Sequence, residues 1–250
     1  MLWLLAFTAG LVRGFSGFGF SMILALGLMA TVPPSVAVPV ALLLDLVCSA
    51  GLWIGACRGF HQPVGYRLIA GMLLAVPIGT LLLTILPALW MTPAVATVCL
   101  VGSGLILARP VAAQKTVDQS RHLAFPAGLA SGLASGLAMS MASAGGPPLM
   151  LYLLRSGLDV TQLRATAILF FAASSACALL GLWLFDALGT EHLQLAVGLL
   201  LPALLGNFAG QYLHHRWQPG SLRVIVGALL AGLSGWLLLT SLSTALTVSL

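Results

Sequence analysis

Charge is almost absent from this chain, and that absence limits the possible folds more than any other feature. Ten basic and five acidic side chains are spread over 250 residues, so only 6% of the residues are charged. A soluble domain carries about 25% charged residues to solvate its surface. The composition therefore excludes a soluble enzyme, a disordered chain and a nucleic-acid-binding protein, because ten basic residues provide no basic face. It predicts an integral membrane protein, surrounded by a lipid bilayer.

Long apolar runs separate the few charged residues. An α-helix needs roughly 20 apolar residues to cross a bilayer. One run is long enough for two helices, with a break expected at the prolines of 87–93. These lengths favour helices over the roughly ten-residue alternating strands of a membrane barrel, and we predict an all-α polytopic membrane protein. The runs cover residues 2–32, 36–57, 68–108, 123–154, 165–185, 193–213 and 224–250.

Neither a cleaved leader nor a metal or cofactor site is predicted. The first run lacks the basic segment that opens a signal peptide, and it continues beyond Arg13 into further apolar sequence. The four cysteines show neither a CxxC pattern nor metal-site spacing. We expect them to act as small packing residues.

The two halves of the chain resemble each other weakly. Residues 6–11 match residues 124–129 at a shift of 118. Further along, Gly71 matches Gly198 at a shift of 127, together with later glycine, leucine and tryptophan positions. Such internal duplication is typical of transporter folds.

The basic residues indicate how the two halves cross the membrane. If 2–32 and 123–154 each crossed once, the basic loops of the two halves would lie on opposite faces, against the positive-inside rule. If each run enters and returns as two short helices, nine basic residues share one face, which we assign to the cytoplasm. Asp186 and Glu191 then lie opposite. The nine are Arg58, Arg67, Arg109, Lys115, Arg121, Arg155, Arg164, Arg216 and Arg223.

This topology predicts two inverted repeats, each a broken-helix hairpin followed by three transmembrane helices. The first repeat covers residues 1–108 and the second covers 122–250, with a cytoplasmic linker at 109–121. Both termini are expected on the periplasmic side. Inverted repeats that begin with broken helices are typical of secondary transporters, which bind substrate near the bilayer midplane and work by alternating access.

The first predicted break lies at residues 13–20. Its glycines allow the backbone to leave helical geometry and to approach a ligand closely. A helix that restarts there points free N–H groups and its positive end into the membrane, which favours an anion. Arg13 adds a full charge roughly 18 Å along the helix, near mid-membrane; the alternative is that it snorkels to a lipid headgroup. The predicted binding residues here are Arg13, Gly14, Ser16, Gly17 and Gly19.

The second predicted break lies at residues 140–148, in the corresponding part of the other hairpin. Its Gly-Gly-Pro-Pro sequence suits an unwound segment followed by a helix start, because proline is tolerated in the first turn of a helix. The two serines offer hydroxyl donors to an anion. The alternative is a packing hinge that binds nothing. The predicted binding residues here are Ser140, Ser143, Gly145, Gly146 and Pro147.

Asp45 lies near the centre of the run 36–57, where an isolated carboxylate is energetically expensive and usually functional. Two hypotheses remain open: Asp45 is a protonatable coupling site, or it is a fixed structural partner of Arg13. Asn207 and Gln211, one turn apart on a later helix, are further candidates for the substrate-binding site, although each could serve only as a hydrogen bond between helices.

These residues resemble the TauE/SafE family of sulfite exporters. The resemblance extends over essentially the whole chain and departs from the family pattern at Ala144, where relatives often have glycine. It implies a multi-pass protein of the bacterial inner membrane that transports a small sulfur-containing anion, such as sulfite, thiosulfate or an organosulfonate, with H⁺ as a candidate coupling ion. The segments that carry it are residues 12–20, 33–34, 37–45, 145–152 and 163–166.

Two other classes of protein are considered. An intramembrane serine protease is suggested by the GxSG pattern of residues 14–17, but this chemistry needs a general base beside the serine, and no histidine or lysine lies within a predicted span. A non-transporting membrane assembly protein would use the glycines for helix packing. Such a scaffold has no need of charges at Arg13 and Asp45.

Overall fold

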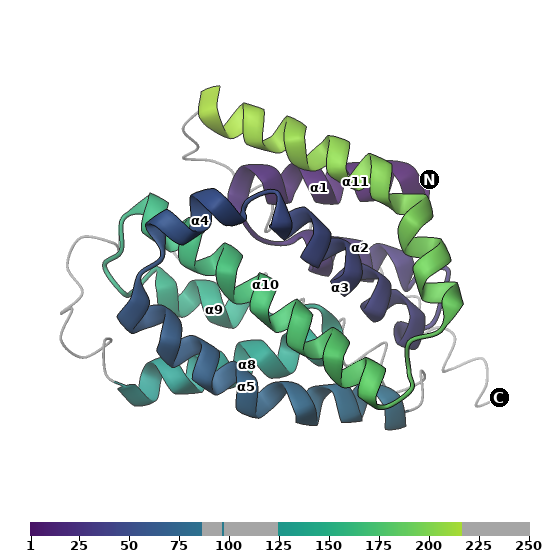
Figure 1. Cartoon of the computed structure of the whole chain (residues 1–250), viewed down its shortest axis with the longest axis horizontal. Coiled ribbons are helices and arrows are strands. Elements are labelled where there is room, and N and C mark those ends of the chain that lie inside the picture. Colours follow the sequence, from purple (N-terminus) through teal and green to yellow (C-terminus); the bar gives the residue numbers. More distant parts are fainter. Residues whose placement is uncertain (87–96, 98–124, 217–250) are drawn as a thin grey trace.

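The computed structural model describes residues 1–86, 97 and 125–216. Every regular element in this part of the chain is a helix, which confirms the predicted all-α class (Figure 1). The predicted linker at 109–121 and the last helix of each predicted repeat lie outside the described residues. The helices are α1 (Leu2–Ser16), α2 (Phe20–Leu28), α3 (Pro34–Ala50), α4 (Trp53–Gly59), α5 (Gln62–Ile85), α8 (Phe125–Ala142), α9 (Gly146–Leu153), α10 (Val160–Leu184) and α11 (Thr190–Arg216).

Four of these helices, α5, α8, α10 and α11, are long and apolar enough to cross a membrane. The predicted span 36–57 differs from expectation because it is bent by 73° between α3 and α4. The bend falls at Gly51, whose lack of a side chain weakens a helix by about 0.5–1 kcal/mol relative to alanine. The bent pair counts as a fifth candidate span, so the chain has the character of a multi-pass membrane protein.

The first predicted hairpin contains a helix break and a reversal. Helix α1 ends at Ser16, and Gly17 and Gly19 then have φ values of 83° and 91° before α2 begins. These left-handed conformations are readily available only to glycine. Helix α2 runs back along α1, since Gly27 of α2 packs against the Leu5 side chain of α1. With 15 and 9 residues, neither helix alone spans a bilayer.

The second predicted hairpin has the same form. Helix α8 ends at Ala142, Ser143 has a φ of 53°, and α9 begins at Gly146. Helix α9 also runs back, because the Tyr152 hydroxyl group lies beside Gly128 near the start of α8. Both helix interruptions therefore occur within the segments predicted to contain them.

Glycines allow one helix of each half to pack closely against a helix of the other. Helix α1 packs parallel to α11, and α5 packs parallel to α8. In Figure 1, α1 and α11 run from right to left, whereas α5 and α8 run from left to right. The first helices of the two halves thus run in opposite directions. The closest approaches are Gly14 to the Asn207 carbonyl, Gly210 to Leu11, Gly132 to Leu68, and Gly71 to Leu129.

This packing agrees with the proposed 118-residue shift between the two halves, which pairs Gly14 with Gly132. Gly14 of α1 packs against Gly210 of α11, and Gly132 of α8 packs against Gly71 of α5. The second shift of 127 instead pairs Gly71 with Gly198, which has no neighbouring atom within 4 Å of an added Cβ. The geometry therefore favours Gly210 as the counterpart of Gly71. The inverted repeat as a whole stays a prediction.

Opposite ends of the molecule carry different charges. The end of α4, the α9–α10 connection and the end of α11 lie together on the left of Figure 1, and they carry Arg58, Arg155 and Arg216. The α10–α11 connection, with Asp186, lies at the other end. The assignment of the basic end to the cytoplasm stays a prediction, as does the side on which the termini lie.

Candidate functional site

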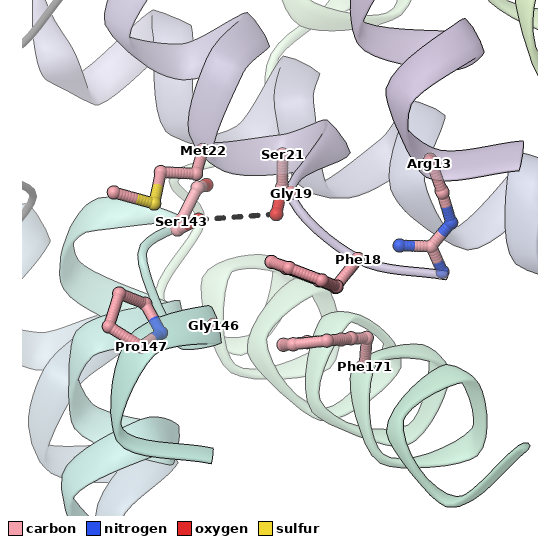
Figure 2. Close-up of a pocket in the computed structure, with 9 residues that line it drawn as sticks. All are labelled: Arg13, Phe18, Gly19, Ser21, Met22, Ser143, Gly146, Pro147 and Phe171. Carbon is pink, nitrogen blue, oxygen red and sulfur yellow. Dashed lines mark hydrogen bonds between the residues drawn. The ribbon is translucent and has the colours of Figure 1, made fainter. Parts of the chain in front are cut away.

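A small cavity lies where the two helix breaks meet. Its walls come from the end of α1, the start of α2, the α8–α9 break and helix α10 (Figure 2). The Ser21 hydroxyl group donates to the Ser143 carbonyl oxygen at 3.2 Å and ties the two breaks together. The cavity volume is about 10 Å³, close to the smallest that holds one water molecule. The lining residues are Arg13, Phe18, Gly19, Ser21, Met22, Ser143, Gly146, Pro147 and Phe171.

Two helix N-termini border this cavity. Gly19 precedes the first turn of α2, and Gly146 begins α9; both line the cavity. The N–H groups in the first turn of a helix have no partner within the helix. They also form the positive end of the helix dipole. The backbone at the start of α2 is therefore suited to an anion. At the start of α9 the Gly146 N–H remains, but Pro147 and Pro148 have no N–H to donate.

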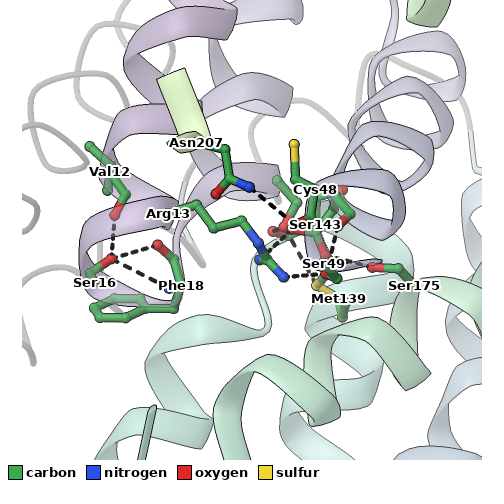
Figure 3. Close-up of polar contacts among 12 residues, drawn as sticks. Val12, Arg13, Ser16, Phe18, Cys48, Ser49, Met139, Ser143, Ser175 and Asn207 are labelled. Atoms are coloured by element: carbon green, nitrogen blue, oxygen red, sulfur yellow. Dashed lines mark hydrogen bonds and ion pairs between the residues drawn. The ribbon is translucent and has the colours of Figure 1, made fainter. Parts of the chain in front are cut away.

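Arg13 is a buried cation beside this cavity, with a side chain that is 1% exposed. Its Nη1 donates to Asp45 Oδ1 at 2.6 Å, and its Nη2 donates to the Ser49 hydroxyl group (Figure 3). Its Nε has no partner within the described part of the chain. Arg13 therefore does not snorkel to a lipid headgroup; it reaches inward to α3.

Asp45 is fully buried and has a partner for each carboxylate oxygen. Arg13 donates to Oδ1, and the Ser175 hydroxyl group of α10 donates to Oδ2 at 2.9 Å. The Ser49 hydroxyl group in turn donates to the Asp45 carbonyl oxygen at 2.6 Å. A buried ion pair is tolerated only when such additional hydrogen bonds offset its desolvation. Asp45 is thus paired with Arg13 in this conformation, and its role as a coupling residue stays a prediction.

The predicted glycines of the breaks divide into two groups. Gly19 and Gly146 line the cavity, together with Pro147. Gly14 and Gly145 instead serve close packing, because an added Cβ would lie 2.0 Å from the Asn207 carbonyl oxygen and 2.7 Å from the Ser135 carbonyl oxygen, respectively. Gly17, with its positive φ, lies against the side chain of Arg164.

The predicted serines divide in the same way. Ser143 lines the cavity, and its Oγ is buried without a partner among the described residues. The Ser16 hydroxyl group donates to the Val12 carbonyl oxygen at 2.7 Å, and the Ser140 hydroxyl group donates to the Gly136 carbonyl oxygen at 2.8 Å. Ser16 and Ser140 therefore bond to the backbone near the end of their own helices.

Asn207 and Gln211 do not line the central cavity. The Asn207 Nδ2 donates to the Cys48 carbonyl oxygen at 3.2 Å and connects α11 to α3. Gln211 lies one turn further along α11 and borders a separate cavity near α4 and α10. The two residues therefore do not form a polar lining at the two breaks.

Sequence reasoning missed several residues of this site. Ser49 could have been found, since it lies one helical turn after Asp45. Ser175 and Phe171 lie within an apolar run, where nothing distinguishes them from packing residues. Arg164 was assigned to a loop face, yet its Nη2 donates to the Gly14 carbonyl oxygen at 2.7 Å across 150 residues. The other missed lining residues are Phe18, Ser21 and Met22.

The fold and the site together define a polytopic helical membrane protein in which two interrupted helices meet beside a buried cation. This is the architecture of a transporter of small ligands. The chain belongs to the sulfite exporter TauE/SafE family, whose sequence profile matches residues 2–237. No curated protein and no solved structure matches the chain.

Proposed function

We propose that this protein is a secondary transporter that exports a small sulfur-containing anion, such as sulfite, thiosulfate or an organosulfonate, by alternating access. The observation that carries the proposal is the buried Arg13 side chain beside a cavity between two helix N-termini. Membership of a sulfite exporter family supports the substrate class and the direction. We propose that the protein lies in the bacterial inner membrane, with the basic end of the molecule in the cytoplasm, as the positive-inside rule favours.

The donors around the cavity match the chemistry of an oxyanion. Backbone N–H groups at the start of α2, the Gly146 N–H of α9 and the Ser143 hydroxyl group supply neutral donors, and Arg13 supplies charge. Sulfite and sulfonates present three oxygen acceptors, so they can accept from several of these groups at once. Charge-assisted bonds of this kind are about twice as strong as neutral ones.

Asp45 provides a means of coupling transport to protons. In this conformation its carboxylate neutralises Arg13, so the pair presents no net charge to an anion. Protonation of Asp45, or a rotation of Arg13 away from it, would release the positive charge toward the cavity. We propose that substrate and proton bind in this linked way, with Asp45 as the coupling residue.

The small size of the cavity supports a closed conformation in the proposed transport cycle. A volume of about 10 Å³ does not admit a sulfur oxyanion. Binding therefore requires the two breaks to separate. Because α1 is packed tightly on α11 and α5 on α8, we propose that these two pairs move as rigid units against each other.

The membrane potential favours export of an anion. An inside-negative potential contributes about 2.3 kcal/mol per charge per 100 mV to outward movement. A doubly charged anion gains twice that amount. Uncoupled movement of the anion, driven by the membrane potential, is therefore a second mode of transport. Measuring anion flux at zero potential separates this mode from proton-coupled transport.

The two other classes have less support. A serine protease needs Ser16 to be free for activation, but its hydroxyl group is bonded to the backbone of its own helix. A packing scaffold accounts for the close-packed glycines but not for a buried ion pair between Arg13 and Asp45. Transport explains both features.

The decisive test is flux of radiolabelled sulfite, thiosulfate and sulfoacetate into proteoliposomes. We expect transport by the wild type, loss of at least tenfold in Arg13→Ala, and loss of proton dependence in Asp45→Asn. Arg216→Ala, which removes an exposed charge at the end of α11, is the matched control and should transport normally. Wild-type flux in Arg13→Ala would exclude the proposed site.

The topology has a separate test. Reporter fusions at residues 115 and 160 should report the same side of the membrane. A result on opposite sides would overturn the re-entrant hairpin at 123–154, and with it the inverted repeat.

A further inference from the structure

A second and larger cavity lies at the basic end of the molecule. It has a volume of about 380 Å³ and lies between the α3–α4 bend, the start of α10 and the end of α11. This volume falls in the range of small-molecule sites. The residues that decide its chemistry are Arg164, Gln211 and His214, and Gly51 and Gly55 also line it.

The polar groups of this cavity favour an anion. Arg164 Nε and Gln211 Nε2 are both buried without a hydrogen-bond partner in the described part of the chain. Both are donors and cannot accept. No acidic residue is among the described residues that line the cavity. Buried donors without partners are costly, and an oxyanion would satisfy both.

Arg164 connects this cavity to the central site. Its Nη2 donates to the Gly14 carbonyl oxygen at 2.7 Å, directly after Arg13 in the chain. Its Cγ lies 2.7 Å from where a Cβ on Gly17 would lie, so a larger residue at Gly17 would displace it. Arg164 therefore contacts Gly14 and Gly17, while Arg13, the residue before Gly14, lines the central cavity.

The opposite end of the molecule carries a cavity of different character. It has a volume of about 250 Å³ and is lined in part by Glu191 and His192. An acidic side chain there does not attract an anion, whereas Arg164 at the basic end does. Of the two cavities, the one at the basic end is therefore better suited to capture an anion.

We propose that the cavity at α4, α10 and α11 is an anion-binding vestibule, in which Arg164 and Gln211 hold a sulfur oxyanion before it reaches the central site. Arg164 also acts as the inner gate, because its bond to Gly14 must break for the anion to pass along residues 13–17. This proposal rests on the proposed transport function. It goes further by naming a second site and a second cation.

The test uses a cysteine inside the vestibule and thiol reagents of opposite charge. Gly55 is a suitable position because it lines the cavity and an added Cβ there meets nothing within 4 Å. Gly55→Cys is made in a Cys57→Ser background, because Cys57 is exposed. The rates of modification by anionic and cationic methanethiosulfonate reagents are then compared in the purified full chain. The parent without Gly55→Cys gives the background rate.

We expect the anionic reagent to react faster at Gly55→Cys, and Arg164→Gln to lower the ratio of the two rates by about five- to tenfold, the effect of one partly screened charge nearby. Arg164→Lys should keep most of the ratio. Gly198→Cys, which is equally open, is the control position, and its ratio should not change with Arg164. Sulfoacetate should slow modification at Gly55→Cys only. An unchanged ratio in Arg164→Gln, in protein that elutes as a single folded species, would overturn the proposal.

Transport supplies a second and separable readout. Arg164→Gln should raise KM for sulfite by about tenfold, whereas Arg13→Ala should lower the maximal rate. Normal KM in Arg164→Gln contradicts a role in capture. If the wild type transports no sulfur anion at all, the proposed function fails, while the reagent ratio still decides whether the vestibule binds anions.

Discussion

Arg13 Nη1 lies 2.6 Å from Asp45 Oδ1, and the two side chains are 1% and 0% exposed. The pair joins the end of α1 to the middle of α3, and Ser175 extends the link to α10. One ion pair therefore ties the first helix break to two long helices. Its removal should affect both the stability of the fold and the chemistry of the site, and suitable variants separate these effects.

The first prediction concerns stability. Arg13→Met leaves the Asp45 carboxylate buried without its cation, which should lower the free energy of unfolding by about 3–5 kcal/mol. The double variant Arg13→Met/Asp45→Leu replaces both charges by apolar groups and should recover most of that loss. Thermal unfolding in detergent micelles measures both. Destabilisation that is additive in the double variant would contradict coupling between the two residues. The double variant should be folded yet inactive in flux assays.

The second prediction concerns close helix packing. Gly10 of α1 faces the Ala203 carbonyl oxygen, and an added Cβ would lie 2.2 Å from it. Gly10→Ala should therefore push α1 from α11 and destabilise the protein by about 1–3 kcal/mol. Gly198→Ala in α11 has open space and should be neutral or more stable by about 0.5–1 kcal/mol. Unfolding temperatures of the two variants in the same detergent provide the comparison, and equal shifts would argue against the packing role.

Sequence patterns predicted the all-α class and the two helix breaks because each follows from a strong local rule. Long apolar runs require helices in a membrane, and clustered glycines or prolines interrupt them. The breaks near Gly17 and Ser143 were therefore predictable. The 73° bend at Gly51 was not, because a single glycine inside an apolar run is usually tolerated.

The site was predictable only in part, for a physical reason. Arg13 and Asp45 stand out because a charge in an apolar run must be compensated. Phe171 and Ser175 carry no such signal, since apolar and hydroxyl residues are common in membrane helices. Arg164 was placed with the surface charges because it lies close to a span end; only the packing of α10 on the first break shows that it points inward.

The third prediction separates two serines at the second break. Ser143 presents an unpartnered hydroxyl group to the cavity, whereas the Ser140 hydroxyl group is bonded to Gly136. Ser143→Ala should raise the apparent KM for sulfite about three- to tenfold, the loss of one hydrogen bond of roughly 1 kcal/mol. Ser140→Ala should leave KM unchanged. Initial flux rates over a range of sulfite concentrations measure both, and a larger effect at Ser140 would move the site away from this cavity.

The fourth prediction concerns the start of α10, which positions Ser175 and Arg164. The Asp159 carboxylate accepts from the Gln162 backbone N–H at 2.7 Å and caps the helix. Asp159→Ala should lower stability by about 1 kcal/mol, whereas Asp159→Asn keeps a capping oxygen and should have little effect. Thermal unfolding distinguishes the two variants. Equal destabilisation by both would indicate that the charge, and not the cap, is what matters.

The fifth prediction concerns which anions fit. Phe171 of α10 lines the central cavity, while the neighbouring Phe170 is equally buried and does not line it. Phe171→Leu should enlarge the site and raise the flux of sulfoacetate relative to sulfite by at least threefold. Phe170→Leu should destabilise the core by a similar amount, about 1–1.5 kcal/mol for a hydrophobic exchange of this kind, without a change in selectivity. The measurement is competition between the two anions in proteoliposomes. A shift in selectivity of the same size in Phe170→Leu would mean that general loosening of α10, and not the cavity wall, sets the preference.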